Sequence, residues 1–285
     1  MRVLIESGDG PVNFVLHPTD LSEASLTAFH HALAIAIRRS ARFTLLHAMG
    51  RRATDDWADF PSVRDTLARW RQSGATDDLE DKIRRSIVDK REVPVRDPVV
   101  ACRDYAETHP VDMIVLATEG RTRLSRLLRP SRAERLAREL RLFTLFVPAG
   151  ARPFVDAESG EVTLRRILVP IDPQTDPRPA MLRAVQAAAL LDDPSLEITL
   201  LHVHTGDGEE TPSTEAPQLP FCKWHVVVRR SEDVVGEILG AAEVGAADAI
   251  YMSTSWHRPG LTRRDGSVTE AVLEQAGCPV AAVPV

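Results

Sequence analysis

Two stretches, Val15-Leu16-His17-Pro18-Thr19-Asp20 and Ile167-Leu168-Val169-Pro170-Ile171-Asp172, show the same pattern in the two halves of the chain. Each is a short apolar run that ends in Pro-x-Asp and is followed by a segment with helical periodicity. A pattern that recurs in this way indicates that one structural unit is present twice.

Three further pairs of apolar runs follow in the same order in both halves. They cover residues 43–48 and 198–203, 111–116 and 247–252, and 143–148 and 279–284. The last two pairs share an offset of 136 residues. Because both order and spacing are kept, we interpret the chain as a tandem repeat with domains at 1–150 and 151–285, joined by a linker near 149–153.

Segments with helical periodicity alternate with these runs. They cover residues 22–39, 98–108 and 131–141 in the first half, with Ser22 as the expected N-cap, and 178–191, 233–245 and 267–276 in the second. Continuous apolar strands that alternate with helices are typical of parallel sheets covered on both faces. The predicted fold class is therefore α/β, with two doubly wound open parallel sheets.

The halves differ between their second and third strands. The first half has about 40 residues there with helical signal (Val63, Leu67, Trp70, Leu79, Ile83 and Ile87). The second half has only residues 205–221, which are rich in Gly, Glu, Thr and Pro. We expect that a loop replaces the second helix there and leaves one face of that sheet less covered.

The composition excludes several classes of function. The 285 residues carry a formal net charge of −6, and only 5% are aromatic, whereas nucleic-acid-binding chains usually have a basic excess. No stretch approaches the roughly 18 uninterrupted apolar residues of a membrane span, and the first residues do not resemble a secretory signal. Cys102, Cys222 and Cys278 form no CxxC pair. We therefore expect a cytoplasmic protein with no nucleic acid or membrane partner and no metal site.

The places where chemistry is expected are the carboxyl ends of the strands, because ligands of open parallel sheets bind there, where the strand order reverses. Two elements fall at such ends in each half. One is the Pro-x-Asp pattern, with Pro18, Thr19 and Asp20 in the first half and Asp172 in the second. The other is the loop that follows the fourth strand, at 117–131 and at 253–267.

These elements resemble the universal stress protein family, with two domains of that family in one chain. Members that bind ATP carry G-x2-G-x9-G-(S/T) in this loop and an Asp at the end of the first strand. The present chain keeps the spacing, as Ala117-x2-Gly120-x9-Pro130-Ser131 in the first half and Ser253-x2-Trp256-x9-Gly266-Ser267 in the second. The resemblance implies five-stranded sheets of order 3-2-1-4-5, a fold like that of the adenine nucleotide alpha hydrolases.

The resemblance also implies a site for ATP or AMP. Small residues let backbone amides approach phosphate, and a helix N-terminus adds a positive dipole end. The implied nucleotide-binding residues are Pro18, Thr19, Asp20, Ala117, Gly120, Arg121, Pro130, Ser131, Asp172, Ser253, Gly266 and Ser267. The sites are degenerate, because Pro130 lacks an amide donor and Trp256 places a large side chain where the family has none.

The function expected from these residues is a nonenzymatic regulator of the stress response. No general base, nucleophile or metal set lies near the loops. Two alternatives stay open: a nucleotide-free scaffold, and a slow ATP hydrolase in which Glu119 or Asp265 orients water.

Two further expectations concern the histidines and the assembly. His202, His204 and His225 could together bind zinc, but we interpret them as structural. Pairing of the final strands, 143–147 with 279–283, would cover both sheet edges and make a pseudo-dimer within the chain, and a homodimer is a further possibility.

Overall fold

A computed structural model describes residues 10–48, 57, 60–73, 77–118, 132–172, 174–205, 219–255 and 268–285. The chain divides into two compact units. The first unit comprises residues 12–149 and 153–163, and the second comprises 1–11, 150–152 and 164–285. The division into domains 1–150 and 151–285 stays a prediction, because compactness does not test whether either part folds alone.

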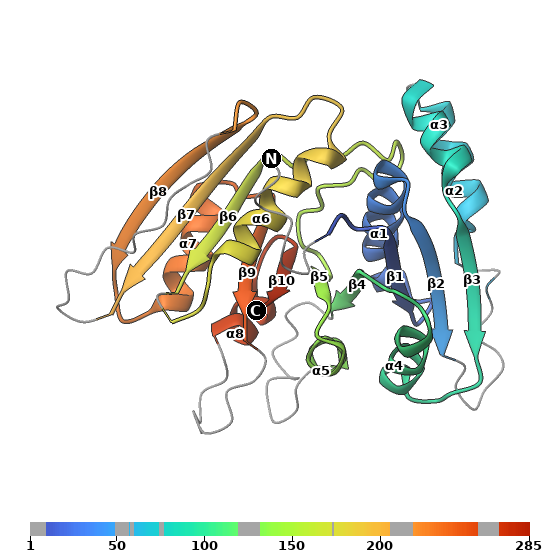
Figure 1. Cartoon of the computed structure of the whole chain (residues 1–285), viewed down its shortest axis with the longest axis horizontal. Coiled ribbons are helices and arrows are strands. Elements are labelled where there is room, and N and C mark those ends of the chain that lie inside the picture. The colour runs from blue at the N-terminus through green and yellow to red at the C-terminus, as the bar shows by residue number, and fades with distance from the viewer. Residues whose placement is uncertain are drawn as a thin grey trace. The chain divides into compact units, whose positions relative to one another are not determined.

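The first unit is built on a parallel sheet of order β3-β2-β1-β4-β5 (Figure 1). Its strands are β1 (Phe14–Thr19), β2 (Arg42–Ala48), β3 (Val88–Val93), β4 (Met113–Thr118) and β5 (Phe143–Pro148). Its helices are α1 (Leu26–Arg39), which follows a 3-10 turn at Glu23–Ser25, α2 (Val63–Gln72), α3 (Asp77–Arg85), α4 (Pro98–Thr108) and α5 (Arg132–Leu140).

The second unit repeats this topology, with the parallel order β8-β7-β6-β9-β10. Its strands are β6 (Arg166–Ile171), β7 (Leu196–His204), β8 (Cys222–Arg230), β9 (Ala249–Thr254) and β10 (Val280–Pro284). Its helices are α6 (Arg178–Gln186), which continues into a 3-10 turn at Ala187–Leu190, α7 (Val234–Val244) and α8 (Val268–Gln275). The predicted α/β class and the order 3-2-1-4-5 are therefore confirmed.

Right-handed crossovers explain how the helices are distributed over each sheet. In the first unit α1 packs beside α3, and α4 packs beside α5, so the two pairs cover opposite faces. In the second unit α7 packs beside α8 in the same way. The core lies between these layers and the central strands, where Val15, Leu16, Val169 and Leu200 are fully buried. Within the described residues, none of the helices has both the length and the apolar character that crossing a membrane requires.

Two details of the sequence prediction are wrong. Ser22 does not cap the first helix: its side chain makes no capping bond and instead donates to Asp20 Oδ1 at 2.6 Å. Ile87 does not belong to a helix face, because α3 ends at Arg85 and Ile87 is 61% exposed just before β3. The pairing predicted between 143–147 and 279–283 joins the two units and stays a prediction.

Where the loop at 205–221 was expected, the structure describes only residues 205 and 219–221. Val226 and Val228 of the neighbouring strand β8 are 62% and 44% exposed. They alternate with His225 and Val227, so they lie on the face of the sheet opposite to the one that α7 covers.

Residues 153–163, called the strap here, pack against the first unit although they follow its last strand. An antiparallel bridge between Val155 and Val162 closes the strap on itself. The amide of Phe154 donates to Nε2 of the buried His31 at 3.2 Å. The Phe154 ring also meets the imidazole of His31 edge-on, with 4.4 Å between the ring centroids.

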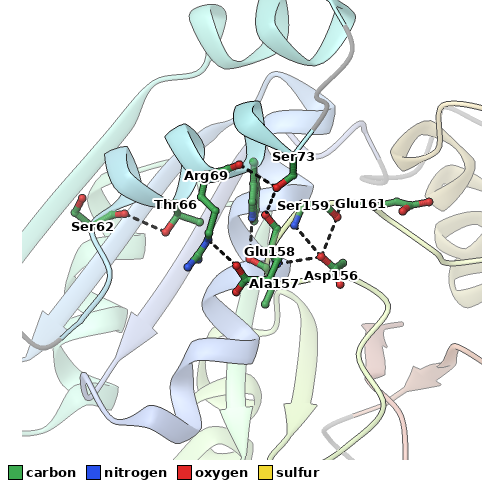
Figure 2. Close-up of polar contacts among 10 residues, drawn as sticks. Ser62, Thr66, Arg69, Ser73, Asp156, Ala157, Glu158, Ser159 and Glu161 are labelled. Carbon is green, nitrogen blue, oxygen red and sulfur yellow. Dashed lines mark hydrogen bonds and ion pairs between the residues drawn. The ribbon is translucent and has the colours of Figure 1, made fainter.

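Helix α2 holds the other side of the strap (Figure 2). The indole of Trp70, which is 1% exposed, donates to the carbonyl of Ala157 at 3.0 Å. Figure 2 shows Arg69 and Ser73 directed toward Glu158: the guanidinium lies 3.6 Å from its carboxylate, and the hydroxyl donates to its carbonyl at 3.1 Å. The strap therefore completes the cover over a large buried aromatic side chain.

Gly160 tests how tightly the strap fits. It has a φ of +70°, and a Cβ at this position would overlap the ring of Trp70. Gly160→Ala is expected to destabilise the protein by about 2–4 kcal/mol, from positive φ and steric overlap together. Gly150→Ala is the matched control, because Gly150 has a φ of +76° but open space around it; about 1 kcal/mol is expected there. Urea unfolding measures both, and equal losses would contradict the fit described.

Candidate functional site

The central strand of each unit separates from one neighbour toward its carboxyl end. In the first unit β1 pairs with β2 over all of Phe14–Thr19, but with β4 only at Val15↔Met113 and Leu16↔Ile114. In the second unit β6 likewise pairs with β9 only at Ile167↔Ala249 and Leu168↔Ile250. The strand order reverses at these two places, so each unit has an opening where ligands of such sheets bind.

Pro18 lies two residues beyond Leu16, the last residue of β1 that pairs with β4, and it still pairs with Leu46 of β2 on the other side. A proline has no N–H to donate, so within a sheet it suits a strand that has lost a hydrogen-bonded neighbour. Pro170 stands at the corresponding place in β6. The Pro-x-Asp pattern thus coincides with the point where the sheet opens.

His17 fills the floor of the opening in the first unit. Its Nδ1 donates to the carbonyl of Val115 on β4 at 2.8 Å, and the residue is fully buried. Its Nε2 is also buried and has no partner among the described residues. Burial lowers the pKa of His17 from 6.5 to about 4, so the imidazole is neutral near pH 7. Val169 takes the place of His17 in the second unit.

The hydroxyl and the carbonyl of Thr19 are both hydrogen-bonded to neighbouring residues. Its hydroxyl accepts from the amide of Leu21 at 3.0 Å and shares a 3.0 Å hydrogen bond with Ser25 Oγ. Ser25 Oγ donates in turn to the carbonyl of Ser22, and His47 Nδ1 donates to the carbonyl of Thr19 at 2.9 Å. These bonds fix the end of β1 to the turn that follows it and leave the Thr19 hydroxyl little capacity for a ligand.

The two aspartates differ in how their oxygens are used. Asp20 is exposed, and its Oδ1 accepts from the amide of Ser22 at 3.0 Å as well as from its hydroxyl. Its Oδ2 accepts no hydrogen bond from the described residues. In Asp172, Oδ1 accepts from the amide of Gln174 and Oδ2 from the hydroxyl of Thr175, both at 2.9 Å. Asp20 therefore keeps an available acceptor, whereas both oxygens of Asp172 are used in its own turn.

The ends of β4 and β9 contribute small side chains. Ala117 is the next-to-last residue of β4, and the hydroxyl of the last residue, Thr118, is buried without a partner among the described residues. Ser253 Oγ accepts from the amide of Ala180 in the first turn of α6 at 3.3 Å. The remaining predicted site residues lie outside the described residues, namely Gly120, Arg121, Pro130, Ser131, Gly266 and Ser267, and so does Trp256, which was expected to obstruct the second site.

The three histidines considered for zinc do not converge. His202 and His204 contact each other edge-on, with 4.2 Å between their ring centroids. His225 is opposite Thr199 in the register of β7 and β8, so it faces the other side of the sheet. Among the residues that the structure describes, no group of three or more His, Cys, Asp or Glu side chains could hold a metal ion.

Sequence reasoning missed His17 and His47, which lie at the opening and were not singled out. The available signal was the comparison of the repeats, because Val169 replaces His17 in an otherwise matching strand. A polar residue that replaces an apolar one in a buried strand must find a partner. His17 finds it across the gap between β1 and β4.

These features define a class of protein: a repeated, doubly wound α/β fold in which each unit opens where its strand order reverses. The model of the universal stress protein family matches residues 13–148 and 224–284. The chain belongs to the universal stress protein family.

Two solved structures that match nearly the whole chain support the same fold. A universal stress protein from Archaeoglobus fulgidus is 18% identical; the match covers 96% of this chain and 98% of that protein, with a TM-score of 0.63. A protein from Pseudomonas aeruginosa described as a universal stress protein is 15% identical over 96% of this chain and 93% of its own, with a TM-score of 0.58. A universal stress protein solved in complex with cAMP is 23% identical over 49% of this chain and 99% of its own, with a TM-score of 0.35. None of the curated proteins matches the chain.

The buried imidazole of His17 makes stability depend on pH. Because its pKa is lower in the folded protein than in the unfolded chain, stability is lost as the pH falls from 6.5 toward 4. The loss for this one group reaches about 3 kcal/mol at about 1.4 kcal/mol per pKa unit. Burial also lowers the pKa of His30 and His31 to about 4, and these residues add to the loss in the wild-type protein.

His17→Val, which copies the second unit, isolates the contribution of His17. The variant is less stable at pH 7, because the carbonyl of Val115 loses its donor. The unfolding free energy of the wild type relative to that of the variant should fall by about 3 kcal/mol between pH 7 and pH 4. Urea titrations across that range measure it. Parallel curves would mean that His17 is protonated equally in the folded and unfolded states.

Proposed function

We propose that the protein is a nonenzymatic cytoplasmic regulator that binds an adenine nucleotide, ATP or AMP, at the opening between β1 and β4 of the first unit. The observation that carries the proposal is the early end of the β1–β4 ladder, after Leu16 and Ile114. An open parallel sheet offers its ligand site at such a place, and the motif resembling the family's phosphate loop follows β4 directly.

The chemistry of the described residues supports this choice. Asp20 stands at the end of β1 with Oδ2 available to accept a hydrogen bond from a ribose hydroxyl or an adenine amino group. Ala117 presents no bulky side chain near the end of β4. His17, neutral at pH 7, places no positive charge under the site, so anion affinity is left to the loop that follows.

The first unit is favoured over the second for two reasons. Both oxygens of Asp172 are used within its own turn, so a ligand would have to displace a bond already formed. In addition, Trp256 occupies the position of the second motif at which the first half has Gly120. A large side chain at a close-approach position excludes a phosphate by its volume. Nucleotide in the first unit would act as a ligand that shifts conformation, not as a substrate.

Asp20→Asn tests the role of the carboxylate. The amide oxygen of Asn can still accept from Ser22, but an NH2 group replaces Oδ2 and meets the donors of the ligand. Calorimetric titration with ATP is expected to show about tenfold weaker binding, the equivalent of about 1.4 kcal/mol. Asp172→Asn is the matched control and is expected to leave the affinity unchanged. Equal effects of the two substitutions would contradict the assignment to the first unit.

The paired variants Gly120→Trp and Trp256→Gly test the ranking of the two loops. Gly120→Trp is expected to abolish ATP binding, and Trp256→Gly to leave it unchanged or to create a second site, because only steric exclusion changes. If Trp256→Gly removes the only binding event, the indole stacks on the base and the second unit is the sensor. Phosphate release from ATP would favour the slow hydrolase, and no binding by any variant would favour the scaffold.

A further inference from the structure

A cavity of about 660 Å³ lies within the second unit, between α7 and the adjoining face of β6, β7 and β8. It is remote from the opening between β6 and β9, because its strand residues belong to the amino-terminal half of β6 and to one face of β7 and β8. Its lining includes Arg166 and Ile167 of β6, Thr199 of β7, Val227 of β8, and Ala241 and Gly245 at α7 and its end.

The repeat identifies the corresponding place in the first unit. In each unit one aspartate precedes the helix and another follows it, and these two positions fix the alignment of α4 with α7. Asp97 and Asp233 cap α4 and α7 by accepting from amides of the first turn at 3.0 and 2.8 Å. Asp112 and Asp248 each accept from two successive amides at the start of the central strand. Both pairs are 136 residues apart, so positions in α4 and α7 match one to one.

In the first unit aromatic side chains fill this place. The rings of Tyr105 and His109 stack with 4.0 Å between centroids and an interplanar angle of 4°. Phe14 meets both rings edge-on, with centroids 6.3 Å away. The phenol oxygen of Tyr105 hydrogen-bonds to the hydroxyl of Thr44 on β2 at 3.0 Å.

In the second unit the aromatic side chains are missing, but a threonine hydroxyl like the one that bonds Tyr105 is kept. Ala241 matches Tyr105, and Gly245 matches His109. Arg166 takes the place of Phe14, and Thr199 takes the place of Thr44, by the register of the central strand with its neighbour. In the described part of the chain the Thr199 hydroxyl has no hydrogen-bond partner. The cavity therefore corresponds to the space that the Tyr105 phenol fills in the first unit, and Thr199 keeps the hydroxyl that such a phenol would bond.

We propose that this cavity binds a planar aromatic molecule that carries a hydroxyl group. The ring takes the place that Tyr105 occupies in the first unit, and its hydroxyl bonds to Thr199. Ile167, Val227 and Ala241 provide apolar contact for the ring. Arg166 offers a guanidinium that can stack on a ring face, as Arg42 lies 5.1 Å from the Phe14 centroid in the first unit.

The cavity, at about 660 Å³, lies within the roughly 300–1,000 Å³ of small-molecule sites and offers more room than a single phenol fills, so we expect a ligand of two fused rings. The helix also leaves room on its own side, since a Cβ on Gly240 would meet no atom within 4 Å. The rim carries both signs of charge, with Arg166 and Arg229 against Glu197 and Glu237. This balance favours a neutral ligand over a strong anion.

The test uses 2-naphthol as the probe and the full chain, with binding followed by the fluorescence of the probe and by calorimetry. One site per chain is expected. Thr199→Val should weaken 2-naphthol binding about fivefold, the loss of one hydrogen bond of about 1 kcal/mol. It should leave 2-methylnaphthalene, which has no hydroxyl, unaffected. Thr44→Val is the matched control in the first unit and should change neither affinity.

Ala241→Tyr fills the cavity with the side chain found in the first unit and should abolish binding of both probes. Glu243→Tyr adds the same side chain on an exposed position of α7 outside the cavity and should bind as the wild type does. Far-ultraviolet circular dichroism shows whether each variant is folded; if Ala241→Tyr is not, Thr199→Val decides alone. Absence of 2-naphthol binding by the wild-type protein, or binding that survives Ala241→Tyr in a folded protein, would overturn the proposal.

Discussion

A central parallel strand can hydrogen-bond to both neighbours along its whole length only if all three strands run side by side to their ends. In this protein β1 and β6 do so with one neighbour and part from the other after two paired positions. Three features follow from this separation of the strands. Pro18 needs no donor there, Asp20 accepts from the turn that follows, and the buried His17 bridges the gap to β4. The candidate site is a consequence of where the ladder ends.

The architecture could be predicted from the sequence because the patterns that indicate it are local and recur in both halves of the chain. Apolar runs gave the strands, the spacing of the repeat gave their correspondence, and Pro18 with Asp20 marked the open end of β1. Other features depend on contacts between distant segments and had no local signal. Examples are the hydrogen bond from His17 to the Val115 carbonyl and the one from the Trp70 indole to the Ala157 carbonyl. Ser22 illustrates a third case. Its hydroxyl could have capped the following helix, but it donates to the carboxylate of Asp20 instead.

The two copies of the repeat show that a fold does not dictate how its interior is filled. Asp112 and Asp248 make the same pair of bonds, and the sheets have the same order. Nevertheless, the space between helix and sheet holds a stacked Tyr–His pair in one copy and a cavity in the other. Backbone hydrogen bonds keep the topology, while side-chain volume is free to change, within the limit that a packed core sets on stability.

The strap shows that the boundary of the sequence repeat and the boundary of the compact unit do not coincide. The sequence repeats from Ile167 onward, whereas the first compact unit still includes residues 153–163. Residues 150–152, which belong to the second unit, lie in the sequence between β5, the last strand of the first unit, and the strap. A fragment that stops at the last strand of the first copy would therefore deprive the Trp70 indole of the Ala157 carbonyl and His31 Nε2 of the Phe154 amide. The first copy relies on residues beyond its own repeat, so a circular permutation that opens the chain between 149 and 153 would separate β5 from the strap in sequence, although both belong to one compact unit.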